Sequence, residues 1–243
     1  ITKDNINFFI SEKKQFSPSI IERQFVEEVL RFAYDMTFGS EGEHRNYRSG
    51  GSHRRKNGEI FCDTFQGKLA EYYVYQKFIE YRIVCPKPDL ERWELGKWDD
   101  VDLIVNDYLI NIKSMAHFSN LLLLETKDWT TDGRYIPNDK KYDYFIIVRL
   151  EPDLKSIFRK NRILYSNNLS LEQLNTLINS INFNADIPGF VTHDHLVKII
   201  NSRHILPKGA YLNGKVPMDA ENYYVTSKDF IELDSLMREM QKI

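Results

Sequence analysis

Three residues in the middle of the sequence carry side chains that can do chemistry together: Asp102, Asn111 and Lys113. Carboxylate and amide oxygens are the donors that a hard cation such as Mg²⁺ prefers. A lysine ammonium beside them can offset negative charge that develops on a reacting group. The set is therefore suited to holding a metal ion next to a positively charged side chain.

A β-hairpin is expected to bring these side chains together. Two short apolar runs flank the turn-forming dipeptide Asn106-Asp107, which favours a tight two-residue turn. Such a turn places Asp102 opposite Asn111, and Lys113 joins Asn111 because side chains alternate between the faces of a strand. The runs are Val101 to Val105 and Leu109 to Ile112.

Two further acids compete with Asp102 for the role of metal ligand. Asp99 and Asp100 lie just upstream, and a longer turn would shift the facing pairs and favour Asp100. We rank Asp102 first, because it alone faces Asn111 when the turn has two residues.

A fourth candidate lies on a helix predicted from Lys68 to Glu80, entered through Gly67. Glu71 shares the apolar line of this helix with Val74 and Phe78, so its carboxylate is expected to be partly buried. Glu71 either pairs with a buried Arg or caps a neighbouring element, or it belongs to the hairpin cluster. The presence of that cluster favours the last interpretation.

The order of these features resembles the PD-(D/E)XK nuclease superfamily. The resemblance covers roughly residues 60 to 150 and consists of Gly67-Lys68-Leu69-Ala70-Glu71, then Asp102, then Asn111-Ile112-Lys113 nine positions after Asp102. It implies an α/β (α+β) fold: a mixed central β-sheet flanked by helices, with an αβββαβ core. The segments Asn111 to Glu125 and Met218 to Val225 also look like parts of a type II restriction endonuclease.

The resemblance implies a Mg²⁺-dependent, sequence-specific endonuclease that hydrolyses double-stranded DNA. Asp102 would bridge the metal and the scissile phosphate. Glu71, Asn111 and the Ile112 carbonyl would complete or position the oxygen shell, and Lys113 would orient or deprotonate the attacking water.

One position departs from the family pattern. Asn111 stands where these nucleases carry Asp or Glu, and an amide brings no negative charge. The resemblance implies that Glu71 restores this charge from the helix. Otherwise the domain would bind DNA without cutting it, and this alternative stays open beside a repair or junction-resolving nuclease.

A basic segment from His44 to Gly58 packs five cations around a Gly-Gly pair. Arginine offers a planar set of donors to phosphates and guanine edges, and the glycines would let the segment enter a DNA groove. We weigh this equally with a solvated loop. The candidate DNA-binding residues are Arg45, Arg48, Arg54, Arg55 and Lys56.

Periodicity predicts further elements around this core. The sequence predicts an amphipathic helix over residues 18 to 38, and a strand buried on both faces from Tyr144 to Leu150. Two C-terminal helices are expected, from Leu171 to Ile181 with Ser170 as N-cap and from Thr192 to Ser202. Residues 1 to 243 are expected to form one domain.

Other polar and aromatic residues receive simpler interpretations. His193 and His195 are explained by a helix start capped by Thr192 rather than by a metal site. Glu125 is either a further active-site acid or, as we prefer, the solvent end of an element. Met218 to Val225, Trp93 and Trp98 either pack or form a DNA-facing surface.

Composition limits the classes of protein to consider. The net charge of −2 argues against a polycation that coats nucleic acid without specificity. The longest apolar run, Leu121 to Leu124, is far too short for a membrane span, and two cysteines with no secretory signal pattern favour the cytoplasm of a bacterium or archaeon. Double-stranded DNA is the expected partner, and palindromic sites favour a homodimer.

Overall fold

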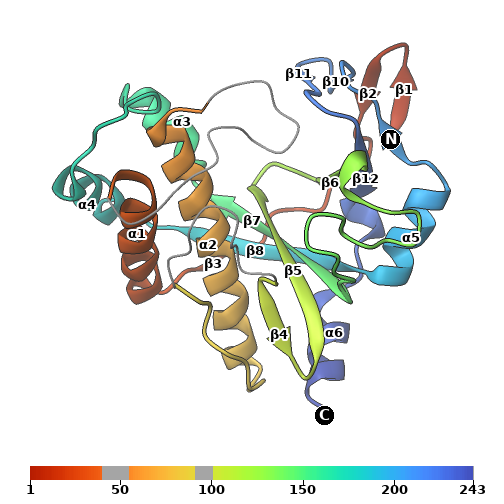
Figure 1. Cartoon of the computed structure of the whole chain (residues 1–243), viewed down its shortest axis with the longest axis horizontal. Coiled ribbons are helices and arrows are strands. Elements are labelled where there is room, and N and C mark those ends of the chain that lie inside the picture. Colours follow the sequence, from red (N-terminus) through yellow and green to blue (C-terminus); the bar gives the residue numbers. More distant parts are fainter. Residues whose placement is uncertain (40–54, 91–100, 243) are drawn as a thin grey trace.

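The structure is a computed structural model that describes residues 1–39, 55–90 and 101–242. Its centre is a five-stranded mixed sheet in the order β3-β8-β7-β5-β4 (Figure 1). β5 and β7 are parallel, and the other neighbours are antiparallel. The strands are β3 (Ser19–Ile20), β4 (Leu103–Val105), β5 (Tyr108–Ala116), β7 (Tyr144–Glu151) and β8 (Asn184–Thr192).

The predicted central strand is confirmed. β7 occupies the middle of the sheet, and its first seven residues are all buried. Its run of β-branched and aromatic residues suits a strand that packs on both faces. β7 therefore separates two apolar cores, one on each side of the sheet.

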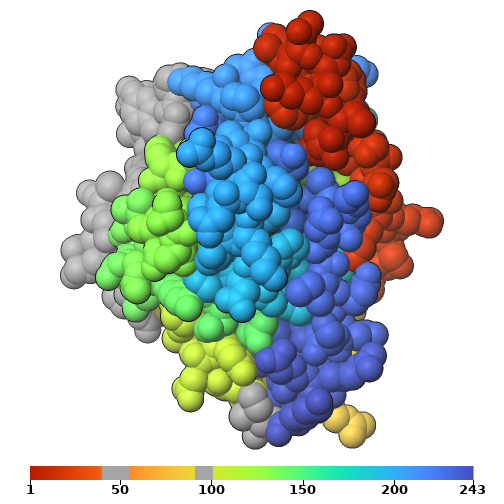
Figure 2. All heavy atoms as spheres, turned by 90° about the vertical axis from the view of Figure 1, so that its right-hand side faces the viewer, coloured from red at the N-terminus to blue at the C-terminus, as the bar shows by residue number. Residues whose placement is uncertain are grey.

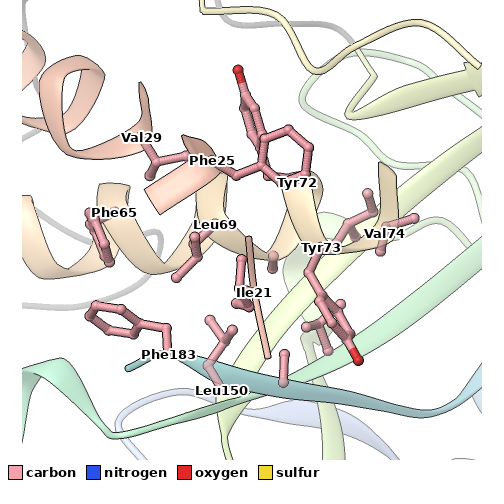
Figure 3. Packing of buried hydrophobic residues seen from close by; sticks show 14 of the residues in the cluster. Ile21, Phe25, Val29, Phe65, Leu69, Tyr72, Tyr73, Val74, Leu150 and Phe183 are labelled. Carbon is pink, nitrogen blue, oxygen red and sulfur yellow. The ribbon is translucent and has the colours of Figure 1, made fainter. Parts of the chain in front are cut away.

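Two helices cover one face of the sheet: α1 (Arg23–Phe38) and α2 (Asn57–Glu80). Figure 3 shows Leu69 and Tyr73 pointing from α2 toward the strands, whereas Tyr72 lies against Phe25 of α1. The centroids of the Phe25 and Tyr72 rings are 5.3 Å apart. This helix pair and the sheet enclose the larger core.

The predicted start of α2 was wrong, because the helix begins at Asn57 and not after Gly67. Ile60, Phe61 and Phe65 are buried on the added turns. Burying such side chains contributes about 1.5–3 kcal/mol each, whereas a glycine inside a helix costs about 1 kcal/mol. Tertiary packing thus carries the helix through Gly67.

A second layer covers the other face of the sheet. It consists of helix α5 and a three-stranded sheet in the order β6-β12-β9. On the surface, α5 lies beside the segment that follows β6 (Figure 2). Phe145 and Ile147 of β7 form the core with this layer. Its elements are β6 (Leu121–Glu125), β9 (Ile205–Leu206), β12 (Asn222–Thr226) and α5 (His193–Asn201).

The remaining elements lie at the periphery. The small sheet contains β1 (Thr2–Asp4), β2 (Asn7–Phe9), β10 (Tyr211–Leu212) and β11 (Val216–Pro217). The helices are α3 (Leu154–Lys160), α4 (Leu171–Asn179) and α6 (Leu233–Met240), with single 3₁₀ turns η1 (Thr126–Asp128) and η2 (Ser227–Asp229). Ser170 caps α4 and Thr192 caps α5, which confirms both predicted helix starts.

The order of elements differs from the expected αβββαβ core. β6 pairs with β12 and not with the hairpin, and η1 is the only helical turn between β6 and β7 in this fully described part of the chain. Gly133 and Pro137 interrupt that segment, so it forms turns rather than a helix. The fold is a mixed α+β arrangement. None of its described helices combines the length and the apolar character that a bilayer span requires.

Candidate active site

The hairpin has the predicted register. Val105 pairs with Tyr108 and Leu103 with Ile110, so the turn consists of Asn106 and Asp107 alone. Both turn residues have positive φ, 49° and 66°, as a type I′ turn requires. The local sequence therefore determines the alignment on which the site depends.

Asp102 lies directly before β4, beside the longer strand β5. Its Oδ2 accepts a hydrogen bond of 2.7 Å from the Ile112 N–H. The N–H and C=O of one strand residue project to the same side of the strand, so the Ile112 carbonyl also faces this edge. The carboxylate thus accepts the Ile112 N–H in place of a backbone carbonyl of β4. Its other oxygen, Oδ1, accepts no hydrogen bond from the described residues.

Lys113 shares the electrostatic environment of Asp102. Burial raises the pKa of Asp102, while the charges of Lys113 and Lys68 and the Ile112 N–H oppose this rise. Burial lowers the pKa of Lys113, and the attraction of Asp102 and Asp128 opposes that fall. A carboxylate and an amine of opposite charge are therefore held close together where water solvates both poorly.

Asn111 supplies the observation that points to a ligand. Its side chain is buried, with only 8% of the residue exposed, and its Oδ1 has no hydrogen-bond partner in the described parts of the chain. A buried acceptor left unpaired costs about 1–3 kcal/mol. A cation or a donor that is not part of the protein would remove this cost.

Glu71 approaches from the opposite layer. Its carboxylate forms an ion pair of 2.7 Å with Lys68, and these two side chains are only 13% and 11% exposed. Lys68 also attracts Asp102, since its charge lowers the pKa of that carboxyl. Glu71 is thus connected to Asp102 through Lys68. The structure brings Asp102 and Lys113 together, and it places Lys68, the partner of Glu71, within electrostatic range of Asp102.

Sequence reasoning missed Asp128. The Trp129 ring packs edge-on against Phe145, with centroids 5.4 Å apart, and Phe145 aligns with Asn111 in the β5–β7 ladder. η1 therefore lies over the face that carries Asn111 and Lys113, and the Asp128 charge acts on Lys113. No periodicity marks this residue, because a non-local packing contact places it.

Glu125 ends β6 on the same side. Burial raises its pKa, although an ion pair of 3.2 Å with Lys127 opposes the rise. The charge of Asp128 also acts on Glu125. The side chain is 21% exposed, so it is less solvated than the expected solvent end of a strand.

Three of the five predicted DNA-binding residues, Arg45, Arg48 and Arg54, fall outside the described residues. The same is true of Asp99, Asp100, Trp93 and Trp98. Arg55 forms an ion pair of 3.0 Å with Asp63, which also pairs with Lys155 at 2.5 Å. This ion pair joins the Arg55 side chain to α2. Lys56 is exposed directly before that helix.

The two histidines begin α5, as expected. The Thr192 hydroxyl accepts a hydrogen bond of 3.2 Å from the His195 N–H. Throughout residues 1–39, 55–90 and 101–242, no three His, Cys, Asp or Glu side chains gather closely enough to hold a metal ion. Met218 packs in the small third core, while Tyr223 and Tyr224 of β12 are half-buried.

The donors at the hairpin edge fit a magnesium ion in kind. The Asp102 carboxylate, the unpartnered Asn111 Oδ1 and the Ile112 carbonyl are all hard oxygen donors. Mg²⁺ usually keeps several water ligands, so one carboxylate and two neutral oxygens provide enough protein ligands for it. The low charge of the set predicts weak binding. Comparison with protein-family models, curated proteins and solved structures found no match, so function must be inferred from this site.

Proposed function

We propose that this chain is a Mg²⁺-dependent endonuclease that cuts double-stranded DNA at specific sequences, as type II restriction enzymes do. The single observation that carries the proposal is the buried, unpartnered Asn111 oxygen on the strand that also holds Lys113 and anchors Asp102. Metal-assisted phosphodiester hydrolysis needs oxygen donors that hold a metal ion, and a positively charged side chain near the phosphate.

Asp102, Asn111 and the Ile112 carbonyl would hold the ion. When bound, Mg²⁺ neutralises the phosphate and makes a bound water more acidic. The Ile112 N–H keeps Asp102 oriented. From α2, Glu71 would complete or position the oxygen shell, and its ion pair with Lys68 fixes that lysine.

Lys113 serves the attacking water and the phosphate. Burial lowers the pKa of Lys113, so its neutral amine, which can accept a proton from water, is more accessible than that of a solvated lysine. In its protonated form the same side chain stabilises negative charge on the phosphate oxygens. Both roles require the position beside Asp102.

The direct test is cleavage of long, unmodified duplex DNA in the presence of Mg²⁺. Discrete fragments are expected from the wild type, none from Lys113→Ala or Asp102→Asn, and normal fragments from Lys215→Ala, an exposed control. Circular dichroism checks that each variant is folded. Cleavage that persists in the Asp102 and Lys113 variants, or no cleavage of any unmodified duplex with any divalent ion, would refute the proposal.

A DNA-binding module without catalysis is the second candidate, and Asn111 favours it. The amide leaves the hairpin's candidate metal site with one carboxylate, and the described residues form no cluster of three His, Cys, Asp or Glu side chains that could hold a metal ion. Such a module would bind duplex DNA equally in EDTA and in Mg²⁺, and Asp102→Asn would not change the affinity. The nuclease should instead bind its site more tightly with a divalent ion, and Asp102→Asn should remove that gain.

A further inference from the structure

A strongly basic segment follows the central strand. Residues 154–171 contain four cations and no Asp or Glu, in a chain whose net charge is −2. Arg159, Lys160 and Arg162, at the end of α3 and in the turn after it, are exposed. None of the three forms an ion pair with a described residue. Their charges are therefore available to a partner.

Hydrogen bonds join this segment to the beginning of α2. The Gly58 N–H donates to the Ser166 carbonyl at 2.9 Å, and the Asn57 side-chain amide donates to the Asn167 carbonyl at 3.2 Å. Figure 1 shows α3 beside that end of α2. The exposed Lys56, which precedes α2, therefore contributes to the same face of the molecule.

Nearby acids are occupied by contacts within the protein. Asp63 pairs with Arg55 and Lys155, and Asp153 accepts the Ser156 N–H at the start of α3. Glu59 accepts the Lys56 N–H at 2.9 Å. These contacts hold the acids against their partners and leave a net positive surface.

An exposed aromatic ring accompanies the cations. Tyr165 is 60% exposed and follows Arg162 by three residues. We call Lys56, Arg159, Lys160, Arg162 and Tyr165 the basic surface. Arginine and lysine match phosphate oxygens, and a tyrosine hydroxyl is a frequent donor to the DNA backbone.

We infer that the basic surface binds backbone phosphates of duplex DNA beside the cleavage site. That DNA is the polyanion rests on the proposed function. Glu71 lies fourteen residues after Asn57 on α2, which is about 21 Å along the helix, or roughly six base pairs of B-DNA. The basic surface would therefore hold the flank of a bound duplex rather than the phosphate that is cut.

The test compares two triple variants of the full chain by fluorescence anisotropy with a labelled duplex. Ca²⁺ replaces Mg²⁺, so that cleavage does not interfere. One variant combines Arg159→Ala, Lys160→Ala and Arg162→Ala. The matched control removes the same charge from the other side of the molecule in Figure 1, at exposed positions on α5, in the turn that follows it, and between β10 and β11: Lys198→Ala, Arg203→Ala and Lys215→Ala.

The basic-surface variant should bind more weakly and with a smaller salt dependence. Each phosphate contact contributes about 0.9 to the slope of log K against log salt concentration, so the slope should become less negative by about 2 to 3. The affinity at 0.1 M salt should fall on the order of 100-fold, uniformly across DNA sequences. The control variant should stay close to the wild type.

The inference would be overturned if the basic-surface variant kept its DNA affinity, or if both variants lost DNA affinity equally. It would also be overturned if the wild type bound phosphatidylserine vesicles and the basic-surface variant lost that binding but kept its DNA affinity. Failure here is distinct from failure of the proposed function. If the wild type cleaves DNA and the basic-surface variant binds DNA normally, the inference fails but the proposed nuclease function stands. If binding depends on the basic surface but no DNA is cleaved, the inference stands and the nuclease function fails.

Discussion

Position 111 carries an amide where a second carboxylate would attract a metal ion more strongly. Beside Asp102 and Lys113, a neutral oxygen avoids a second buried negative charge when no cation is bound. The same oxygen is left without a hydrogen bond in the described structure. Asn111 thus limits the attraction for a cation and yet leaves an acceptor that a cation or a water molecule can satisfy.

The variant Asn111→Asp should make the folded protein depend on divalent cations. Without them, a second buried carboxylate near Asp102 should lower the free energy of unfolding by about 1–3 kcal/mol. Mg²⁺ or Mn²⁺ should restore the loss, because the ion binds only the folded state. Urea unfolding with and without the ion measures both effects. The exposed control Asn168→Asp should show neither.

Asp128 is expected to position Lys113. Since its charge acts on the ammonium from the η1 side, Asp128→Asn should lower kcat for DNA cleavage while KM stays the same. Asp139→Asn, in the same segment but 84% exposed, is the control. Asp128→Glu should recover part of the rate. A changed KM with unchanged kcat would assign Asp128 to DNA binding instead.

At the scale of elements, one buried ion pair ties the central sheet to the N-terminal segment. Arg149 of β7 is 1% exposed and binds Asp186 of β8 through Nε and a second nitrogen. It also donates to the carbonyls of Lys14 and Gln15 at 2.9 and 2.8 Å. The guanidinium therefore satisfies backbone acceptors that the sheet itself does not pair.

Arg149→Met should destabilise the protein by about 3–5 kcal/mol, because it leaves the Asp186 carboxylate buried without its partner. The double variant with Asp186→Leu should recover most of this loss, since both charges are then gone. Urea unfolding measures the free energies. A loss below 1 kcal/mol in the single variant would show that water replaces the guanidinium.

Local signals were sufficient for several elements. The turn dipeptide Asn106-Asp107 determined the hairpin register, and Ser170 and Thr192 marked the helix starts that the structure contains. The start of α2 was missed because its added turns depend on packing. The pairing of β6 with β12, which are far apart in the sequence, has no local signal.

For the candidate site the same distinction holds. Asp102 and Lys113 were placed together from a two-residue turn and strand alternation, which are local rules. Lys68 and Asp128 reach the hairpin from different layers of the fold, so their places depend on tertiary packing. The sequence could not show that Glu71 pairs with Lys68.

At the scale of the whole molecule, one buried and one half-buried histidine predict how the free energy of unfolding responds to acid. Burial lowers the pKa of His193 and, on the same helix, of His195. As pH falls below 6.5, the unfolded chain takes up protons before the folded chain does. The free energy of unfolding should therefore decrease as the pH is lowered from 6.5 toward the lower pKa values that the two histidines have in the folded protein.

Urea unfolding at a series of pH values between 7.5 and 5 measures this dependence. His193→Gln should weaken it, because the replacement does not titrate. The effect of other groups, including the opposite effect of the raised Asp102 pKa, is common to both proteins and cancels in the difference. Identical pH profiles for wild type and variant would contradict the expectation.

The most direct test of the account asks where a divalent cation binds. Fe²⁺ can replace Mg²⁺, and with ascorbate and peroxide it cuts the polypeptide beside its ligands, which mass spectrometry locates. The account predicts cuts next to Asp102 and at Asn111 to Ile112, suppressed by excess Mg²⁺ and absent in Asp102→Asn. Cuts confined to other segments, or unchanged in Asp102→Asn, would contradict it.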